Sequence, residues 1–176
     1  MSAETVILGL DPGSRFTGYG VIVGRGSRLR LVGQGRISLP SDRPLVQRLG
    51  ILTQELERLL ERFNPEVAVL ESLFRGVNVR SLIVLAQARG ALLATLATAE
   101  LEIREYSPSE IKSAVTGDGR ADKQQVTKMV KMILGFRNEL TTDAADALAA
   151  AICCSQRAGI ERLGAGNRPG ERDVKR

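Results

Sequence analysis

Three short apolar runs open the chain, and each is bounded by glycine or by polar residues. The runs at 5–10 (TVILGL) and 17–23 (TGYGVIV) are rich in apolar and β-branched residues, and 28–38 (RLRLVGQGRIS) begins with alternating polar and apolar positions. Such runs are typical of strands. The turn sequence GRGS separates the second run from the third. The pattern therefore predicts an antiparallel meander of three strands.

A helix and then a buried strand are expected next. Apolar residues recur at three- and four-residue spacing over 45–63, and an Asn-Pro pair ends this pattern. Residues 66–71 (EVAVLE) are short and nearly all apolar, which is typical of a buried parallel strand. A second helix, at 78–99, is apolar around most of its circumference, so it requires either central burial or a partner subunit. We favour a dimer interface for this helix.

The second half of the chain alternates strand and helix. Residues 102–106 (EIREY) predict a strand, and SPSE at 107–110 predicts a helix start with a serine cap, an early proline and a glutamate that returns to the cap. Further helices are expected at 123–134 and at about 143–158. A meander followed by alternating helices and strands predicts an α/β domain with a mixed sheet. Residues 159–176 are rich in glycine and charge, and we expect a disordered tail.

Length and composition fit one domain, which we place at residues 1–158 of the 176. No apolar run in the sequence reaches the roughly 18 residues of a membrane span, and the first residues do not resemble a signal peptide. We therefore expect a soluble, cytoplasmic protein with no membrane partner. The adjacent Cys153 and Cys154 would be strained as a disulfide, so we expect two reduced thiols.

The charge balance and the absence of histidine narrow the chemistry. The 25 Lys and Arg outnumber the 20 Asp and Glu, which gives a pI near 9.7 and favours a polyanionic partner. With four Phe, two Tyr and no Trp, duplex or branched nucleic acid fits better than a single strand bound by stacking. Without histidine, Ser-His-Asp triads, Cys-His pairs and zinc proteases are excluded. Catalysis would depend on carboxylates, lysine or a metal.

Four acidic residues stand where an acid is locally unexpected. Asp11 ends the first strand and Glu71 ends the strand at 66–71. Asp143 and Asp146 lie in an alanine-rich helix. Each has a structural explanation by itself, namely an Asx turn, an ion pair with a nearby arginine, or an interaction with the helix macrodipole.

Together, the four acids indicate a metal site. Strand ends at one edge of an α/β sheet share a crevice, and helix positions i and i+3 lie on one face about 5 to 6 Å apart. Converging carboxylates either shift their pKa values or surround a cation. All-oxygen sites suit Mg²⁺ or Mn²⁺, and two such ions about 4 Å apart can support hydrolysis of a phosphodiester.

Four segments, in this order, carry a family resemblance: ILGLDPGSRFTGYGVI, AVLESLF, LAQARGALL and TDAADALAAAI. Over about residues 4–156 the chain resembles the RuvC family of bacterial Holliday junction resolvases. The resemblance implies a ribonuclease H-like fold with a mixed five-stranded sheet flanked by helices. It also implies a homodimer and paired nicks at a four-way DNA junction that leave 5′-phosphate and 3′-hydroxyl ends.

The resemblance further assigns residues, cofactors and partners. The catalytic and metal-binding acids of the family would fall on Asp11, Glu71, Asp143 and Asp146, although some relatives carry histidine at the position of Asp143. The cofactor implied is Mg²⁺, with two ions per subunit and Mn²⁺ as a substitute. The partners implied are four-way junction DNA and the RuvA–RuvB branch-migration complex.

Four residues are expected to contact DNA, namely Phe74, Arg75, Lys112 and Lys123. Phe74 would either fold back on the core or act as an apolar wedge that stacks on a base, which is the role of the matching aromatic in the family. Lys112 and Lys123 flank the loop TGDGRA and match family lysines near the DNA backbone. Arg80 and Arg89 are further candidates, and Arg89 also fits a structural role.

Two other interpretations remain open from the residues alone. The stretch LGLDPGSRFTGYGV, whose glycines we expect to allow a tight turn, resembles a phosphate-binding loop of actin-like ATPases and sugar kinases. That class needs a second phosphate turn and a second domain, for which 176 residues are too few. The other interpretation is a non-catalytic DNA-binding protein with structural acids.

Overall fold

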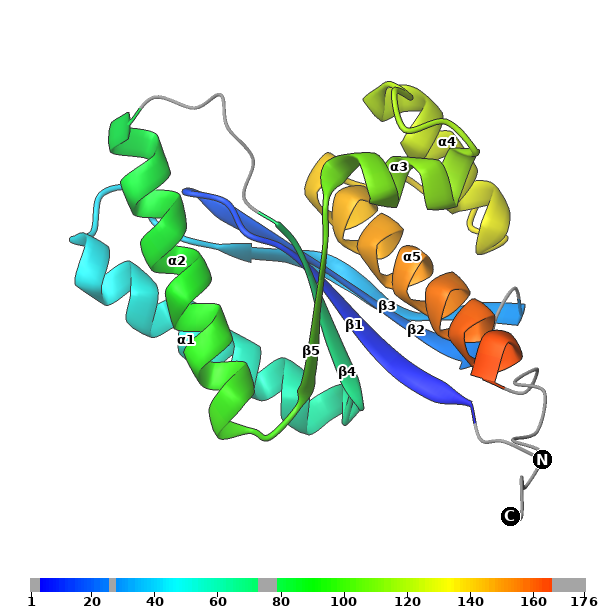
Figure 1. Ribbon diagram of the computed structural model, residues 1–176. Helices are drawn as coiled ribbons and strands as arrows, with labels where there is room; N and C mark the ends of the chain where they lie inside the picture. Colours follow the sequence, from blue (N-terminus) through cyan, green and yellow to red (C-terminus); the bar gives the residue numbers. More distant parts are fainter. Residues whose placement is uncertain (1–3, 26–27, 73–78, 166–176) are drawn as a thin grey trace, which may run out of the picture.

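The computed structural model of the protein describes residues 4–25, 28–72 and 79–165 (Figure 1). The strands within these ranges are β1 (Thr5–Asp11), β2 (Phe16–Arg25), β3 (Arg28–Ser38), β4 (Val67–Glu71) and β5 (Glu102–Tyr106). The helices are α1 (Leu45–Phe63), α2 (Val79–Thr98), α3 (Pro108–Thr116), α4 (Lys123–Ile133) and α5 (Thr142–Ala165).

The strands form one mixed sheet in the order β3-β2-β1-β4-β5. β1 pairs with β2 and β2 with β3 in antiparallel directions, whereas β1 pairs with β4 and β4 with β5 in parallel. The predicted α/β class, the three-strand meander and the mixed five-stranded sheet are thus confirmed. β1 lies at the centre, because it joins the antiparallel half of the sheet to the parallel half.

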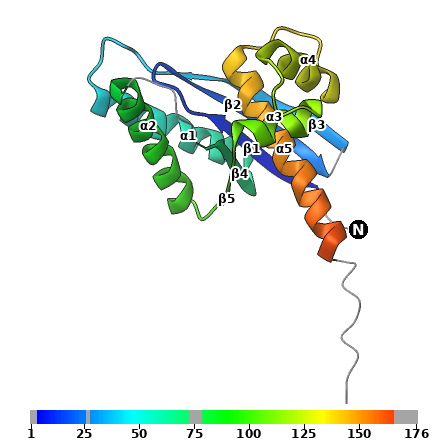
Figure 2. The same cartoon turned by 45° about the horizontal axis from the view of Figure 1, so that its top comes forward.

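Helices cover both faces of this sheet. α1 and α2 lie against one face, and α3, α4 and α5 lie on the other (Figure 1, Figure 2). Side chains alternate between the two cores: Ile7 of β1 joins the core beneath α5, while Leu8 and Leu10 join the core beneath α1 and α2. Asp11 follows the same alternation, so its side chain lies on the α5 face.

Glycines in β1 and β2 bring α5 unusually close to the sheet. A Cβ built on Gly9 would lie 1.9 Å from the carbonyl oxygen of Ala147, and one on Gly18 would lie 2.1 Å from that of Asp143. Both glycines are within strands. The expectation that the glycines of this stretch serve a tight turn was therefore wrong for these two, which make room for the backbone of a helix.

α5 presents small side chains to this glycine surface. Six alanines of its first half are buried, each at most 1 % exposed: Ala144, Ala145, Ala147, Ala149, Ala150 and Ala151. Cys153 and Cys154 continue the buried face as free thiols, in agreement with the prediction. Burial raises the pKa of Cys153 to about 11.

α5 continues past its predicted end near residue 158 to Ala165. A single glycine inside a helix costs only about 1 kcal/mol, so Gly159 does not end it. The beginning of the predicted disordered tail is thus helical, and residues 166–176 lie outside the described residues.

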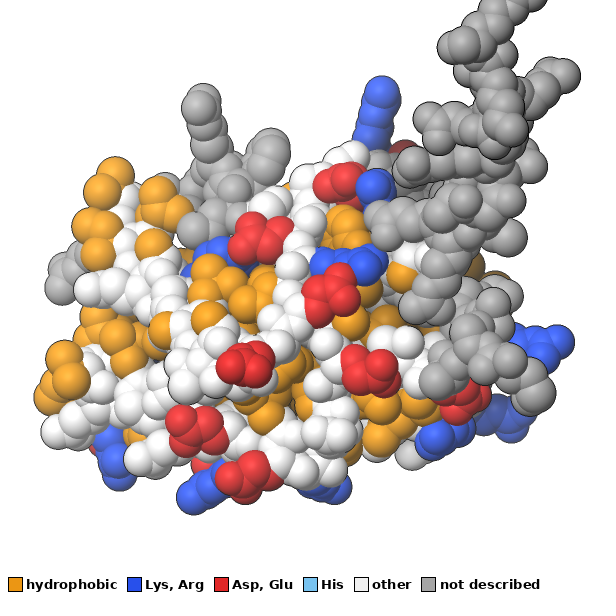
Figure 3. All heavy atoms as spheres, turned by 60° about the horizontal axis from the view of Figure 1, so that its bottom comes forward, with side chains coloured by type: hydrophobic (Ala, Val, Ile, Leu, Met, Phe, Trp, Pro, Cys, Tyr) orange, Lys and Arg blue, Asp and Glu red, His pale blue; other side chains and the backbone are white. Residues whose placement is uncertain are grey.

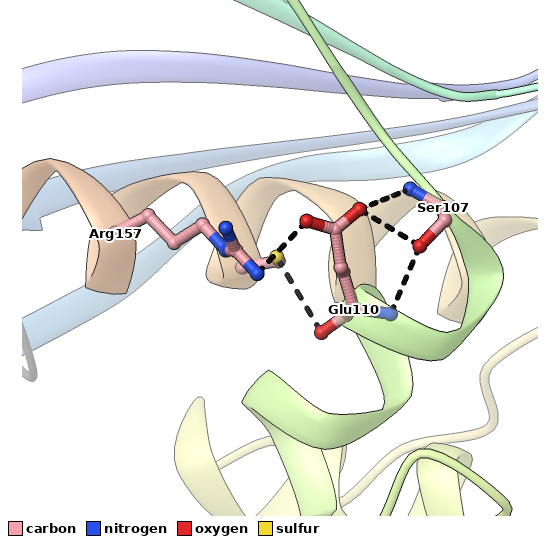
Figure 4. Close-up of polar contacts among 4 residues, drawn as sticks. Ser107, Glu110 and Arg157 are labelled. Carbon is pink, nitrogen blue, oxygen red and sulfur yellow. Dashed lines mark hydrogen bonds and ion pairs between the residues drawn. The ribbon is translucent and has the colours of Figure 1, made fainter.

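The capping box at the start of α3 forms as predicted (Figure 4). The Glu110 carboxylate accepts hydrogen bonds from the Ser107 backbone N–H at 2.9 Å and from the Ser107 hydroxyl at 2.7 Å. Arg157 of α5 lies 2.9 Å from the same carboxylate. The start of α3 is therefore tied to α5, which fixes α3 next to the carboxyl ends of the central strands.

The inner side of α2 packs on the sheet, while its outer side is apolar and exposed. Leu92 and Leu96 are fully buried, whereas Val79 is 72 % and Ile83 55 % exposed. Figure 3 shows hydrophobic side chains gathered toward the α1 and α2 side of the molecule. Ala86, Gly90, Ala94 and Ala97 extend the exposed stripe at helical spacing. We call the stripe formed by these six residues the outer face of α2.

By length and composition alone, Ser81–Thr98 is apolar enough to cross a membrane. Polar residues such as Gln87 and Arg89 interrupt this segment, so the prediction that no uninterrupted apolar run reaches the roughly 18 residues of a membrane span still holds. Core helices of soluble proteins pass the same test. Here Arg89 is buried within the fold and paired with Glu105, which is how a helix of a folded domain accommodates a charge.

Gly9→Ala should strongly destabilise the protein, because the added methyl group meets the α5 backbone at 1.9 Å and the backbone cannot rotate away. We expect a loss of about 3 kcal/mol or more. Gly50→Ala is the matched control, since nothing lies within 4 Å of its added Cβ on exposed α1; it should gain about 0.5 to 1 kcal/mol. Urea unfolding measures both, and equal stability of the two variants would contradict the close approach of α5.

Candidate active site

Two of the four predicted acids end adjacent parallel strands. The pairing of β1 with β4 matches Leu10 to Leu70, so the next residues, Asp11 and Glu71, leave the sheet side by side at the same edge. Both side chains lie on the α5 face, because Leu10 and Leu70 belong to the opposite core. The strand ends thus present two carboxylates toward the start of α5.

The other two acids come from the first turns of α5. Asp146 lines a cavity of about 200 Å³ together with Asp11 and Glu71. Asp143 is not among the residues that line this cavity, but its charge acts on Asp11. The close contact of Gly18 with the Asp143 backbone sets the distance between this turn of α5 and the strand ends. Three of the predicted acids therefore share one cavity, and the fourth lies beside it.

Mutual repulsion and burial shift the acid that ends β1. Desolvation by burial, followed by the charges of Asp146, Glu71 and Asp143, raises the pKa of Asp11 from 3.8 to about 7. The pKa of Glu71 is raised for the same leading reason, with Asp146 as the next cause. Negative charge at this cavity is therefore incompletely compensated by the protein alone, which is the electrostatic condition for binding a cation.

Two predicted lysines border the cavity. Lys123, at the start of α4, places its Nζ 3.1 Å from Asp146 Oδ2, and the contact raises the pKa of the lysine. The Lys123 side chain is 73 % exposed, so it can leave this contact without crossing the core. Lys112 of α3 also lines the cavity. Both lysines thus place positive charge at the border of the carboxylate cavity.

The donor set fits a hard divalent cation. Carboxylate oxygens are the preferred ligands of Mg²⁺ and Mn²⁺, and three carboxylate groups line the cavity. No group of three or more acidic or cysteine side chains in the described part of the chain forms a ready-made cage for an ion. Instead, the Lys123 ammonium neutralises Asp146. A cation would replace this contact.

Several predicted and unpredicted residues complete the description. Phe74 and Arg75, which we expect to contact DNA, lie outside the described residues, and so does the side chain of Arg80. The apolar wall of the cavity, formed by Pro108, Ile111, Val126 and Ala149, was not predicted. The sequence pattern indicates that α3 and α4 have apolar faces, but it does not indicate which of these apolar residues border a cavity.

Comparisons with known proteins give one consistent result. The family model for the crossover junction endodeoxyribonuclease RuvC matches residues 7–154. The RuvC of Anaeromyxobacter sp. (strain K) is 48% identical over 148 residues, which are 84% of this chain and 79% of that protein. The RuvC of Alkalilimnicola ehrlichii is 46% identical over 90% of this chain and 98% of its own length.

Among solved structures, that of Thermus thermophilus RuvC in complex with Holliday junction substrate has a TM-score of 0.84 and 30% sequence identity. The match covers 89% of this chain and 96% of that one. It confirms the ribonuclease H-like arrangement of the sheet and helices. Given this fold, the acids at its strand ends and a family model that spans most of the sequence, the chain belongs to the RuvC family of crossover junction endodeoxyribonucleases.

Proposed function

We propose that the protein resolves four-way (Holliday) DNA junctions in homologous recombination and DNA repair. The observation that carries the proposal is the convergence of Asp11, Glu71 and Asp146 on one cavity bordered by Lys112 and Lys123, in a member of the RuvC family. A relative of this chain was solved with a Holliday junction substrate, which supports the same substrate here. The reaction is a pair of symmetric nicks, one in each of two like-polarity strands.

The nick is the hydrolysis of a phosphodiester. A water oxygen forms a bond to phosphorus while the bond from phosphorus to the 3′ oxygen breaks, and the leaving oxygen takes up a proton. The products are a 5′-phosphate and a 3′-hydroxyl, which a ligase can join. Mg²⁺, or Mn²⁺ in its place, would supply activation of the water and stabilisation of the leaving oxygen, with two ions proposed per subunit.

Each residue of the site has a separate task in this scheme. Asp11, Glu71, Asp146 and Asp143 would hold the metal through carboxylate oxygens. Lys123 and Lys112 would bind phosphates of the DNA backbone, and Lys123 could do so by leaving Asp146 once a cation offsets the charge of that carboxylate. Binding of the metal, which offsets the negative charge of the site, would thus favour binding of DNA, and binding of DNA would favour binding of the metal.

Two further contacts to DNA are part of the proposal. Phe74 follows Glu71 closely in sequence and would stack on a base at the junction, and Arg75 would bind a neighbouring phosphate. The RuvA–RuvB complex is proposed as the partner that delivers the junction. The place of action is proposed to be the cytoplasm, where bacterial DNA is found.

A homodimer is proposed because a symmetric junction requires two sites. The outer face of α2 supplies the surface, since Val79, Ile83 and the small residues between Ala86 and Ala97 are exposed on one side of the helix. Small residues allow the backbones of two helices to approach closely, and exposed aliphatic residues supply the area to be buried.

Asp11→Asn should abolish cleavage while junction binding is retained, because the substitution removes a metal ligand without adding bulk. The assay incubates a synthetic four-way junction or a linear duplex of the same sequence with and without Mg²⁺. The parent protein should give symmetric nicks in the junction alone and only with Mg²⁺, and the variant should show a loss of at least about 100-fold. Cleavage by Asp11→Asn at the parent rate would refute the assignment.

Without metal, the protein should become less stable as pH rises. The pKa of Asp11 is about 7 in the folded protein and near 3.8 when unfolded, so the folded state binds the proton more tightly. Stability is therefore greatest below about pH 4 for this group and is lost as pH rises through 7. Mg²⁺ should reverse the trend, because it binds the ionised carboxylate.

Scanning calorimetry at pH 5 to 8, with EDTA or with millimolar Mg²⁺, tests this pH dependence. Each kcal/mol corresponds to a change in Tm of about 2 to 4 °C in a domain of this size. Asp11→Asn should show a flatter pH trend in EDTA, and Asp146→Asn should be at least as stable as the parent there and gain less from Mg²⁺. Identical trends in all three proteins would contradict a shared carboxylate site.

Ile83→Glu should convert the proposed dimer to a monomer, because it places a charge on the outer face of α2 at one of its two large aliphatic residues. Light scattering after size-exclusion chromatography distinguishes the 19.0 kDa monomer from a species of twice that mass. Met132→Glu is the matched control, since Met132 is 67 % exposed on α4 and away from this face. A dimer that survives Ile83→Glu but not Met132→Glu would place the interface elsewhere.

A further inference from the structure

Arg89 is the only buried charged residue in the described part of the chain, at 6 % exposure. It lies in the middle of α2, on the side that packs against the sheet. Burying a guanidinium in an apolar core is costly unless the charge is paired and hydrogen bonded. Methionine or leucine would fill the same position at less cost, so the arginine requires an explanation beyond packing.

The guanidinium of Arg89 binds two strands at once. Its Nη1 donates a hydrogen bond of 2.5 Å to the backbone carbonyl of Glu71, the last residue of β4. Its Nη2 lies 2.7 Å from Oε1 of Glu105 in β5, an ion pair that does not have the alignment of a hydrogen bond. The planar fork of an arginine can make both contacts, whereas a lysine offers a single ammonium.

These contacts are made on the face of the sheet opposite to the cavity. Arg89 approaches from α2, whereas the side chain of Glu71 lies with Asp11 and Asp146 on the α5 face. Within the sheet, β5 also holds the end of β4. Glu71 is in register with Tyr106, and the N–H of Ser72 donates a hydrogen bond of 2.8 Å to the Tyr106 carbonyl. Arg89 adds a side-chain contact to the Glu71–Ser72 peptide group, which directly follows the residue that carries the carboxylate.

We propose that Arg89 is a positioning residue for cleavage: it fixes the end of β4 from beneath the sheet and thereby holds the Glu71 carboxylate at the spacing from Asp11 and Asp146 that a metal requires. The inference rests on the proposed role of Glu71 as a metal ligand. Ligands that bind metal must be held within a fraction of an ångström, and groups that orient them are worth about 10- to 100-fold in metal affinity or activity.

The test compares Arg89→Met, which keeps the volume and removes both contacts, with Arg89→Lys and the parent. Mg²⁺ affinity is measured without DNA, from the rise of Tm with Mg²⁺ concentration, and single-turnover cleavage is measured at saturating junction. Arg58→Met is the matched control, since Arg58 forms an exposed ion pair with Glu55 on α1, away from the cavity.

Arg89→Met should weaken Mg²⁺ binding and slow cleavage, each by about 10- to 100-fold, while the Kd for the junction in EDTA stays within about twofold of the parent. Arg89→Lys should recover part of both losses, because an ammonium can still reach one of the two oxygens. Arg58→Met should leave all three quantities unchanged. A role in stability alone would lower Tm and leave the Mg²⁺ affinity of the folded protein at the parent value.

A folded Arg89→Met with parent Mg²⁺ affinity would overturn the proposal. If Arg89→Met does not fold, the Mg²⁺ affinities of Arg89→Lys and Glu105→Ala test the proposal instead. Glu105→Ala is suitable because Glu105 is half-exposed and its loss removes only the ion pair. Parent Mg²⁺ affinity in both would likewise overturn it. Glu71→Gln, measured alongside, separates failure of the proposed active site from failure of the role of Arg89. If Glu71→Gln cleaves at the parent rate, the proposed active site is wrong. If Glu71→Gln is inactive while the Arg89 variants match the parent, only the role of Arg89 is wrong.

Discussion

The close contact between α5 and the glycines of β1 and β2 is the constraint on which the site depends. At Gly9 and Gly18 the helix backbone occupies the space of a missing side chain, and a row of buried alanines keeps the helix at that distance along its first half. Any larger side chain in this layer would lift α5 from the sheet. Asp146 would then leave the strand ends, and Asp11 and Glu71 would remain as an isolated pair.

This packing brings like charges together, and their repulsion and burial lower the stability of the folded protein. Burial and repulsion raise the pKa values of Asp11 and Glu71, and the positive charge of Lys123, which pairs with Asp146, offsets these shifts only in part. Such a site is unfavourable by itself and becomes favourable with a cation. The carboxylates lie at the edge of the sheet, while the two apolar cores on either face of the sheet stabilise the fold.

Much of the fold and of the site could be predicted from local pattern. The meander, the cap at Ser107 and the acids that end β1 and β4 follow from alternation, from capping chemistry and from the position of a charge after an apolar run. The contacts of Gly9 and Arg89 could not, because each is made with a backbone atom of a different segment of the chain. Sequence pattern indicates that a residue is buried and does not indicate what it meets there.

The burial of α5 also determines which part of the molecule opens last. Segments that exchange their amide hydrogens by local opening have few buried apolar contacts, whereas residues 7–10 of β1 and, apart from Asp146, residues 144–155 of α5 are buried. We expect the amides of these buried residues to exchange slowly, because they open only together with a large part of the fold. Asp11 directly follows one of these buried segments and Asp146 lies within the other, so local opening at the surface leaves their spacing unchanged.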